Sequence, residues 1–94
     1  MNLNTVKRLS ILMQLSYMKK FEGTMYELEK ELGYTAGHPE TRQIFKFLRE
    51  LNILYPSAKI YGHVVYKIDI KKLCELIESQ DFIKKVSYYL DYIH

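Results

Sequence analysis

The first apolar pattern along the chain has the spacing of an α-helix and gives that helix two apolar faces. It covers residues 4–20. One face holds Val6, Leu9, Leu12 and Met13, and a second stripe, spaced i, i+4 and i+7, holds Ile11, Leu15 and Met18. A central core helix packed on both sides explains the two faces, and so does a helix whose second stripe meets a partner subunit.

A short second helix is expected to begin near Met25. Thr24 and Glu27 form a capping box, in which each side chain satisfies a free backbone N–H. Gly33 is suited to end the helix in a left-handed conformation. The inward positions are Leu28 and Leu32, and the positions expected to face water are Glu29, Lys30 and Glu31. The preceding residues 22–24 are candidates for a short strand added to a later sheet.

The third expected helix begins at Pro39, which suits a first helical position, and runs to about Leu51. Its core face holds Ile44, Phe47, Leu48 and Leu51. On the helical wheel three cations, here called the basic row, project away from this face: Arg42, Lys46 and Arg49. Thr41 and Gln43 lie beside the row near the helix start. The row is either a solvated face or a contact surface.

The spacing of apolar residues changes to every second residue over residues 53–69, where β-branched and aromatic residues dominate. This predicts a hairpin that turns around Gly62. Pro56 cannot donate to a central ladder, so its strand is either at an edge or starts late. A short helix over 70–78 and a longer one over about 81–93 follow. The last helix has an apolar stripe of Phe82, Ile83, Val86, Tyr89, Leu90 and Ile93. The elements together predict an α+β fold that is mostly α.

Length and composition narrow the class of protein. The chain has 94 residues, 48% hydrophobic, with a net charge of +3, which favours one soluble domain over residues 1–94. No apolar run approaches the roughly 20 residues that span a bilayer. Cys74 is the single cysteine and lies among leucines, which favours a buried thiol over a redox sensor. The histidines have no spacing typical of metal ligands, so neither a metal nor a cofactor is expected.

Three segments in order carry a resemblance to a known family: "TMYELEKELG", "ETRQIFKFLRELNIL" and "VVYKI". Over about residues 5–78 the chain resembles the winged helix-turn-helix transcription regulators of bacteria, archaea and their viruses. The resemblance implies a three-helix core, a two- to three-stranded β-wing and extra C-terminal helices. It implies that helix 39–51 lies in the major groove of double-stranded DNA and that the wing touches backbone or minor groove. The protein would then be cytoplasmic, or in the host-cell cytoplasm if viral.

The candidate DNA-binding residues come from the third helix and the hairpin. They are Thr41, Arg42, Gln43, Lys46, Arg49, Lys59, Tyr61 and His63. The family often carries arginine at the wing tip, whereas this tip offers Lys59, Tyr61 and His63, which favours backbone contact. Where glycine often follows the third helix of the family, this chain has Asn52, which also tolerates a left-handed conformation.

The last helix, about 81–93, resembles the helix through which such regulators dimerise. The candidate dimerisation residues are Ile11, Leu15, Met18, Phe82, Val86, Tyr89, Leu90 and Ile93. A homodimer of this kind would read two half-sites about 34 to 36 Å apart.

Other functions remain open at this point. A winged helix also serves as a protein-interaction module. An RNA or single-stranded DNA binder would use exposed aromatic residues such as Tyr26, Phe45 or Tyr61 for stacking. An enzyme is not expected, because the chain has no catalytic triad spacing and no glycine-rich phosphate loop. His38, beside Pro39, is expected to be a helix cap or a surface residue, and His63 an exposed turn residue.

Overall fold

The computed structural model describes residues 3–18, 20–35 and 37–88 as an α+β fold that is mostly helical. Within these residues five helices and one three-stranded sheet follow each other along the chain. They are α1 (Leu3–Ser16), β1 (Glu22–Gly23), α2 (Met25–Glu31), α3 (Pro39–Glu50), β2 (Leu54–Ile60), β3 (His63–Ile68), α4 (Ile70–Glu78) and α5 (Phe82–Tyr88). The predicted α+β class is confirmed.

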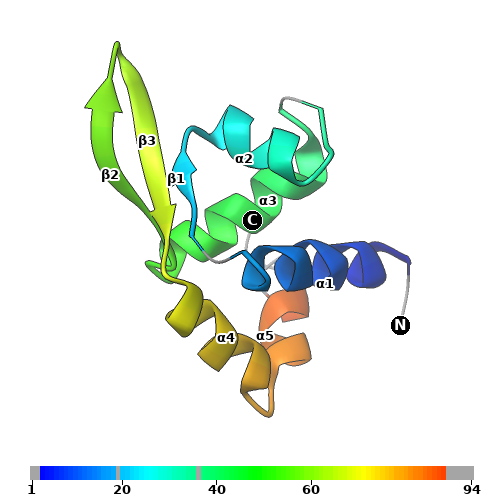
Figure 1. Ribbon diagram of the computed structural model, residues 1–94. Helices are drawn as coiled ribbons and strands as arrows, with labels where there is room; N and C mark the ends of the chain where they lie inside the picture. The colour runs from blue at the N-terminus through cyan, green and yellow to red at the C-terminus, as the bar shows by residue number, and fades with distance from the viewer. Residues whose placement is uncertain (1–2, 19, 36, 89–94) are drawn as a thin grey trace.

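The sheet is antiparallel, with strand order β1-β3-β2. Glu22 pairs with Lys67, so the expected extra strand from residues 22–24 is present as β1. β2 is an edge strand, which suits Pro56 because proline has no N–H to donate to a second neighbour. The hairpin of β2 and β3 projects beyond the helices, and its tip lies at the opposite end of the molecule from α4 and α5 (Figure 1).

The caps predicted for α2 and α3 are formed as expected. The Thr24 hydroxyl oxygen accepts from the Glu27 N–H at 3.1 Å, and the Glu27 carboxylate accepts from the Thr24 N–H at 3.1 Å. His38 is the N-cap of α3, where its Nδ1 accepts from the Glu40 N–H at 3.3 Å, and Pro39 follows as the first helical residue. The φ of Gly33 is +80°, which confirms the left-handed end of α2.

Three further left-handed residues shape the chain around the sheet. Asn52, with a φ of 58°, ends α3 and turns the chain toward β2. Its neighbour Ile53 donates its N–H to the Leu48 carbonyl at 2.9 Å, which closes the end of the helix. Tyr61 and Gly62 have φ values of 50° and 81° and form a two-residue turn, which confirms the prediction that the hairpin turns around Gly62.

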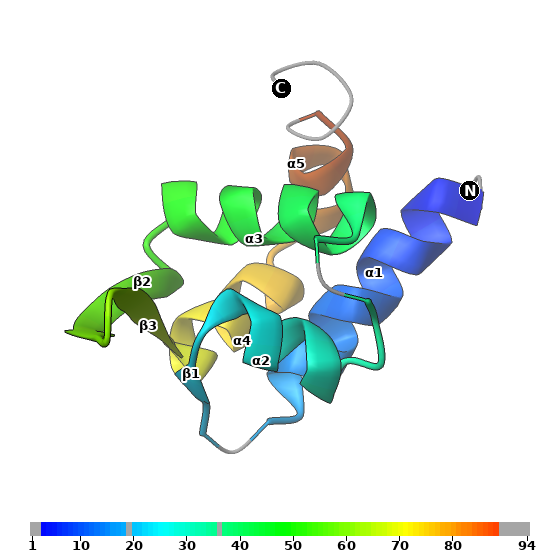
Figure 2. The same ribbon diagram turned by 90° about the horizontal axis from the view of Figure 1, so that it is seen from above.

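The hydrophobic core lies among the helices and the base of the sheet. In Figure 2, α3 runs across the molecule from the side of α1 toward the hairpin. The fully or almost fully buried core residues of the helices include Ile11, Leu12, Leu15, Leu28, Ile44, Phe45, Leu48, Leu73 and Val86. The first helix therefore packs into the core with its second stripe.

The described part of the candidate dimerisation stripe is covered within one chain. Ile11 and Leu15 have no exposed surface, Phe82 and Val86 are buried, and Met18 packs half-buried against the same core. Of the two explanations for the second apolar face of α1, the structure supports packing within the chain. Tyr89, Leu90 and Ile93 lie outside the described residues.

For several side chains the observed burial is the opposite of the predicted burial. Phe45, expected to be available for stacking, is completely buried, because α3 lies between α1 and β2 and buries a wider arc than one stripe. Leu51, expected in the core, follows the end of α3 and is 36% exposed. Val6 and Met13 of the first apolar face of α1 are also exposed.

Candidate functional site

The outward face of α3 opens on a hollow between this helix and the start of β2. The hollow has a volume of about 600 Å³. Its lining includes the whole basic row together with Met25, Asn52, Leu54, Tyr55 and Pro56. All three cations of the row are exposed, as the helical wheel predicted. The fold thus brings cations from three successive turns of α3 to one concave surface.

Lys46 and Arg49 differ from Arg42 in their surroundings. Among the residues that the structure describes, no hydrogen bond or ion pair holds the Lys46 ammonium or the Arg49 guanidinium. Both charges are therefore available to an external anion. Glu50 also lines this hollow and is the one acidic residue among the described residues that line it.

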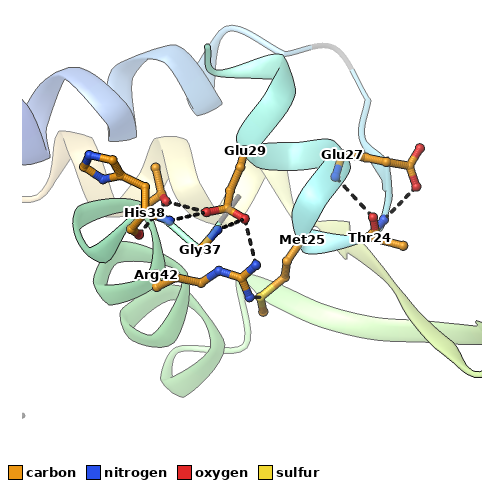
Figure 3. Close-up of polar contacts among 8 residues, drawn as sticks. Thr24, Met25, Glu27, Glu29, Gly37, His38 and Arg42 are labelled. Carbon is orange, nitrogen blue, oxygen red and sulfur yellow. Dashed lines mark hydrogen bonds and ion pairs between the residues drawn. The ribbon is translucent and has the colours of Figure 1, made fainter. Parts of the chain in front are cut away.

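Arg42 is held by α2. Its Nη2 donates to Glu29 Oε1 at 2.7 Å, and its Nη1 lies 3.4 Å from the sulfur of Met25 (Figure 3). The Arg42 side chain is still 43% exposed, whereas the Glu29 side chain has no exposed surface. The first cation of the row is thus both fixed from behind and accessible from outside.

Glu29 was expected to face water, and this prediction is wrong. Its Oε1 also accepts from the Gly37 N–H at 3.1 Å, and its Oε2 accepts from the His38 N–H at 3.0 Å and from the Thr41 hydroxyl at 2.9 Å (Figure 3). The carboxylate therefore joins α2, the α2–α3 connection and the first turn of α3.

Two opposing effects set the pKa of Glu29. Burial raises the pKa by removing the charged form from water. Hydrogen bonds from Arg42, Gly37 and Thr41, with the positive charge of Arg42, lower it by a larger amount, and the pKa falls below its ordinary value of 4.5. Glu29 is therefore an anion at neutral pH.

The helical wheel of α2 holds a signal for the burial of Glu29. At about 100° per residue, Glu29 lies roughly 40° from Met25 and 60° from Leu32, at the margin of the apolar arc. Its position inside the run "LEKEL" hides this, because three successive charged residues resemble a solvated face. Partners from the α2–α3 connection and from the first turn of α3 make its burial stable.

Thr41 is completely buried, so the expectation that it lies at the outer surface of α3 is wrong. Its hydroxyl lies 2.9 Å from Glu29 Oε2 and 2.9 Å from the His38 carbonyl oxygen. This side chain lies in the interior, where an external ligand does not reach it. Gln43 is half-buried beside it.

The hairpin residues divide into two groups. His63 shares a second hollow, of about 540 Å³, with Arg42, Met25, Tyr26 and Tyr66, so the fold brings it close to the start of the basic row. Lys59 and Tyr61 line neither hollow and are exposed near the tip, where Tyr61 is 97% exposed.

The remaining candidate chemistry is sparse in the described part of the chain. Residues 3–18, 20–35 and 37–88 contain no group of three or more His, Cys, Asp or Glu side chains placed to hold a metal ion. No helix within these ranges is both long and apolar enough to cross a membrane. Cys74 is a free thiol, half-buried in α4.

Comparison of the chain with protein-family models, curated proteins and solved structures found no match.

Proposed function

We propose that this chain is a winged helix-turn-helix protein that binds double-stranded DNA and regulates transcription by occupying a site near a promoter. In this proposal α3 enters the major groove, and the hairpin of β2 and β3 is the wing. The order α1, β1, α2, α3, β2 and β3 with a three-stranded antiparallel sheet supports this fold.

The observation that carries the proposal is the pair of uncompensated cations on the outward face of α3. Lys46 and Arg49 point into the hollow beside β2 and have no ion-pair partner among the described residues. An α-helix fits the width of the major groove, and lysine and arginine are the usual contacts to phosphates and guanine edges. A polyanion is therefore the ligand whose charge suits this surface.

Ile11 and Leu15 are not available for dimerisation, because the chain itself covers these side chains. A dimer, if it forms, must use other surfaces. Of the three aromatic residues considered for stacking on single strands, Phe45 is buried, whereas Tyr26 and Tyr61 are exposed.

The test is duplex binding measured by fluorescence anisotropy over a series of salt concentrations. Each neutralised phosphate makes the logarithm of the binding constant fall by about 0.9 per logarithmic unit of salt. The double variant Lys46→Ala/Arg49→Ala should bind more weakly at low salt, with a slope smaller by up to about 1.8. Its thermal stability should stay close to wild type, because exposed charges contribute little to folding.

A matched control removes the same charge elsewhere. Lys71 and Lys84 are exposed on α4 and α5, at the end of the molecule away from the hairpin tip (Figure 1). The variant Lys71→Ala/Lys84→Ala should keep most of the affinity and the slope. Absence of duplex binding by the wild type at low salt would refute the proposal, and equal losses in both double variants would refute the assigned surface.

A further inference from the structure

We infer that Glu29 is a positioning residue that holds Arg42 as the base-reading group of α3, while Lys46 and Arg49 supply the salt-dependent part of the affinity. This inference rests on the proposed function and divides the basic row into two kinds of residue. Glu29 itself is buried and touches no DNA.

The orientation of the Arg42 guanidinium is fixed by two residues of α2. Glu29 and Met25, both on α2, contact its two terminal nitrogens at 2.7 and 3.4 Å. A guanidinium has five N–H donors in one plane, so these contacts leave donors free on the exposed side. Arg42 lines both hollows of the surface, next to Lys46 on one side and His63 on the other. Its free donors therefore have a defined direction.

The Glu29 carboxylate that holds Arg42 is itself held rigidly. Glu29 accepts hydrogen bonds from Gly37, His38 and Thr41 as well as from Arg42. A carboxylate with four protein partners has little freedom to move. An arginine held by such a group loses less conformational entropy when it binds than a free side chain does. Reading a base by two parallel hydrogen bonds needs this kind of fixed geometry.

Glu29 also changes the net charge that Arg42 presents to a ligand. The Glu29 carboxylate lies 2.7 Å from Arg42 and offsets its positive charge over longer distances. Arg42 therefore adds little to the counterion release that phosphate binding produces, whereas Lys46 and Arg49 keep their full charge. Arg42 is also the fourth residue of α3, and the N-terminal residues of recognition helices are those that contact base edges.

The experiment compares sequence discrimination with salt dependence. A preferred duplex is first selected from random sequences, and binding is then measured to this duplex and to versions with single guanines replaced. Arg42→Ala should reduce the discrimination at one guanine by about 5- to 150-fold. Lys46→Ala and Arg49→Ala should each reduce the slope by about 0.9 and leave that discrimination unchanged.

The variant Glu29→Gln distinguishes positioning from a structural role. It preserves the size of the side chain and removes the charge that offsets Arg42. The slope should rise by about 0.9 while the discrimination falls. A purely structural role would lower the melting temperature without raising the slope. Glu31→Gln, an equal change of charge at an exposed position of the same helix, should leave slope and discrimination as in the wild type.

Arg42→Lys is the second variant if Glu29→Gln does not fold, because it retains the charge beside Glu29 and loses the planar fork. Discrimination should fall with little change in slope. Retained discrimination in both Arg42 variants, or a wild type without sequence preference, would overturn this inference and leave DNA binding intact. A wild type that binds no duplex would instead overturn the proposed function.

Discussion

The Glu29 carboxylate organises the connection between α2 and α3. Backbone N–H groups at a helix start need acceptors when they leave water. Glu29 serves two of them, at Gly37 and His38, and also the hydroxyl of Thr41. A buried charge is stable only when it is paired and hydrogen-bonded, and Arg42 completes the set. One side chain thus fixes both the connection and the first cation of α3.

Acid should remove the stabilisation that Glu29 provides. Its pKa lies below the ordinary value of 4.5 in the folded chain. A carboxyl group of this kind stabilises the fold above its unfolded-state pKa and loses that contribution as the pH falls through its folded-state pKa. At neutral pH, Glu29→Gln should lower the free energy of unfolding by about 1 to 3 kcal/mol.

This difference should shrink as the pH falls below 4.5 toward the lower folded-state pKa of Glu29, because the carboxyl group is protonated first in the unfolded chain and then in the folded one. Urea denaturation of both proteins across the acid range measures it. Glu31→Gln is the control and should match the wild type at neutral pH. A difference between wild type and Glu29→Gln that stays constant into strong acid would contradict the charged state assigned to Glu29.

Among the elements, the hairpin of β2 and β3 has a strained turn at its tip. Tyr61 has a φ of 50°, a left-handed conformation that a bulky side chain rarely adopts. The ring is 97% exposed, so almost no burial offsets the strain. Asparagine followed by glycine is the preferred pair for this type of turn, and Gly62 already occupies the second position.

Replacing Tyr61 by Asn should therefore stabilise the chain by up to about 1 kcal/mol, because Asn tolerates the left-handed conformation. Urea denaturation measures the free energy of unfolding. Tyr61→Phe retains a bulky ring at the same φ and should remain as stable as the wild type. If the tip touches DNA, Tyr61→Asn should lower the affinity while it raises the stability. Equal stability of the two variants would contradict the assigned strain.

At the scale of the whole molecule, one core joins the helices to the base of the sheet. Ile11 and Leu15 of α1 share this core with Phe82 and Val86 of α5. The last described helix and the first helix therefore contribute to one core within the same chain. This arrangement leaves the basic row on the far side of α3 from its buried face, open beside β2.

Leu15→Ala tests whether this core belongs to a single chain. The loss of a fully buried leucine should lower the free energy of unfolding by about 2 to 5 kcal/mol. The shift in melting temperature should be the same in dilute and concentrated protein. Met13→Ala, at a 37% exposed position of the same helix, should have a much smaller effect. A Leu15→Ala shift that depends on protein concentration would indicate that a second subunit contacts Leu15.

The sequence by itself determined the features that depend on near neighbours in the chain. The capping box of Thr24, the helix start at Pro39 and the turn at Gly62 were all predictable. Each depends on hydrogen bonds or backbone angles within three or four residues. The periodicity also predicted that the basic row faces outward, and the missing N–H of Pro56 indicated a strand that is at an edge or starts late. These local interactions are encoded in the order of residues alone.

Only the tertiary structure decided which side chains have partners far away in the sequence. Glu29 and Thr41 are 12 residues apart, and Glu29 and Arg42 are 13 apart, so no local pattern joins them. The helical wheel gives the direction of a side chain from its own helix axis, but it does not say which element packs there. That packing buried Glu29 and Phe45, and it separated Arg42 from Lys46 and Arg49, because only Arg42 lies within reach of the carboxylate on α2.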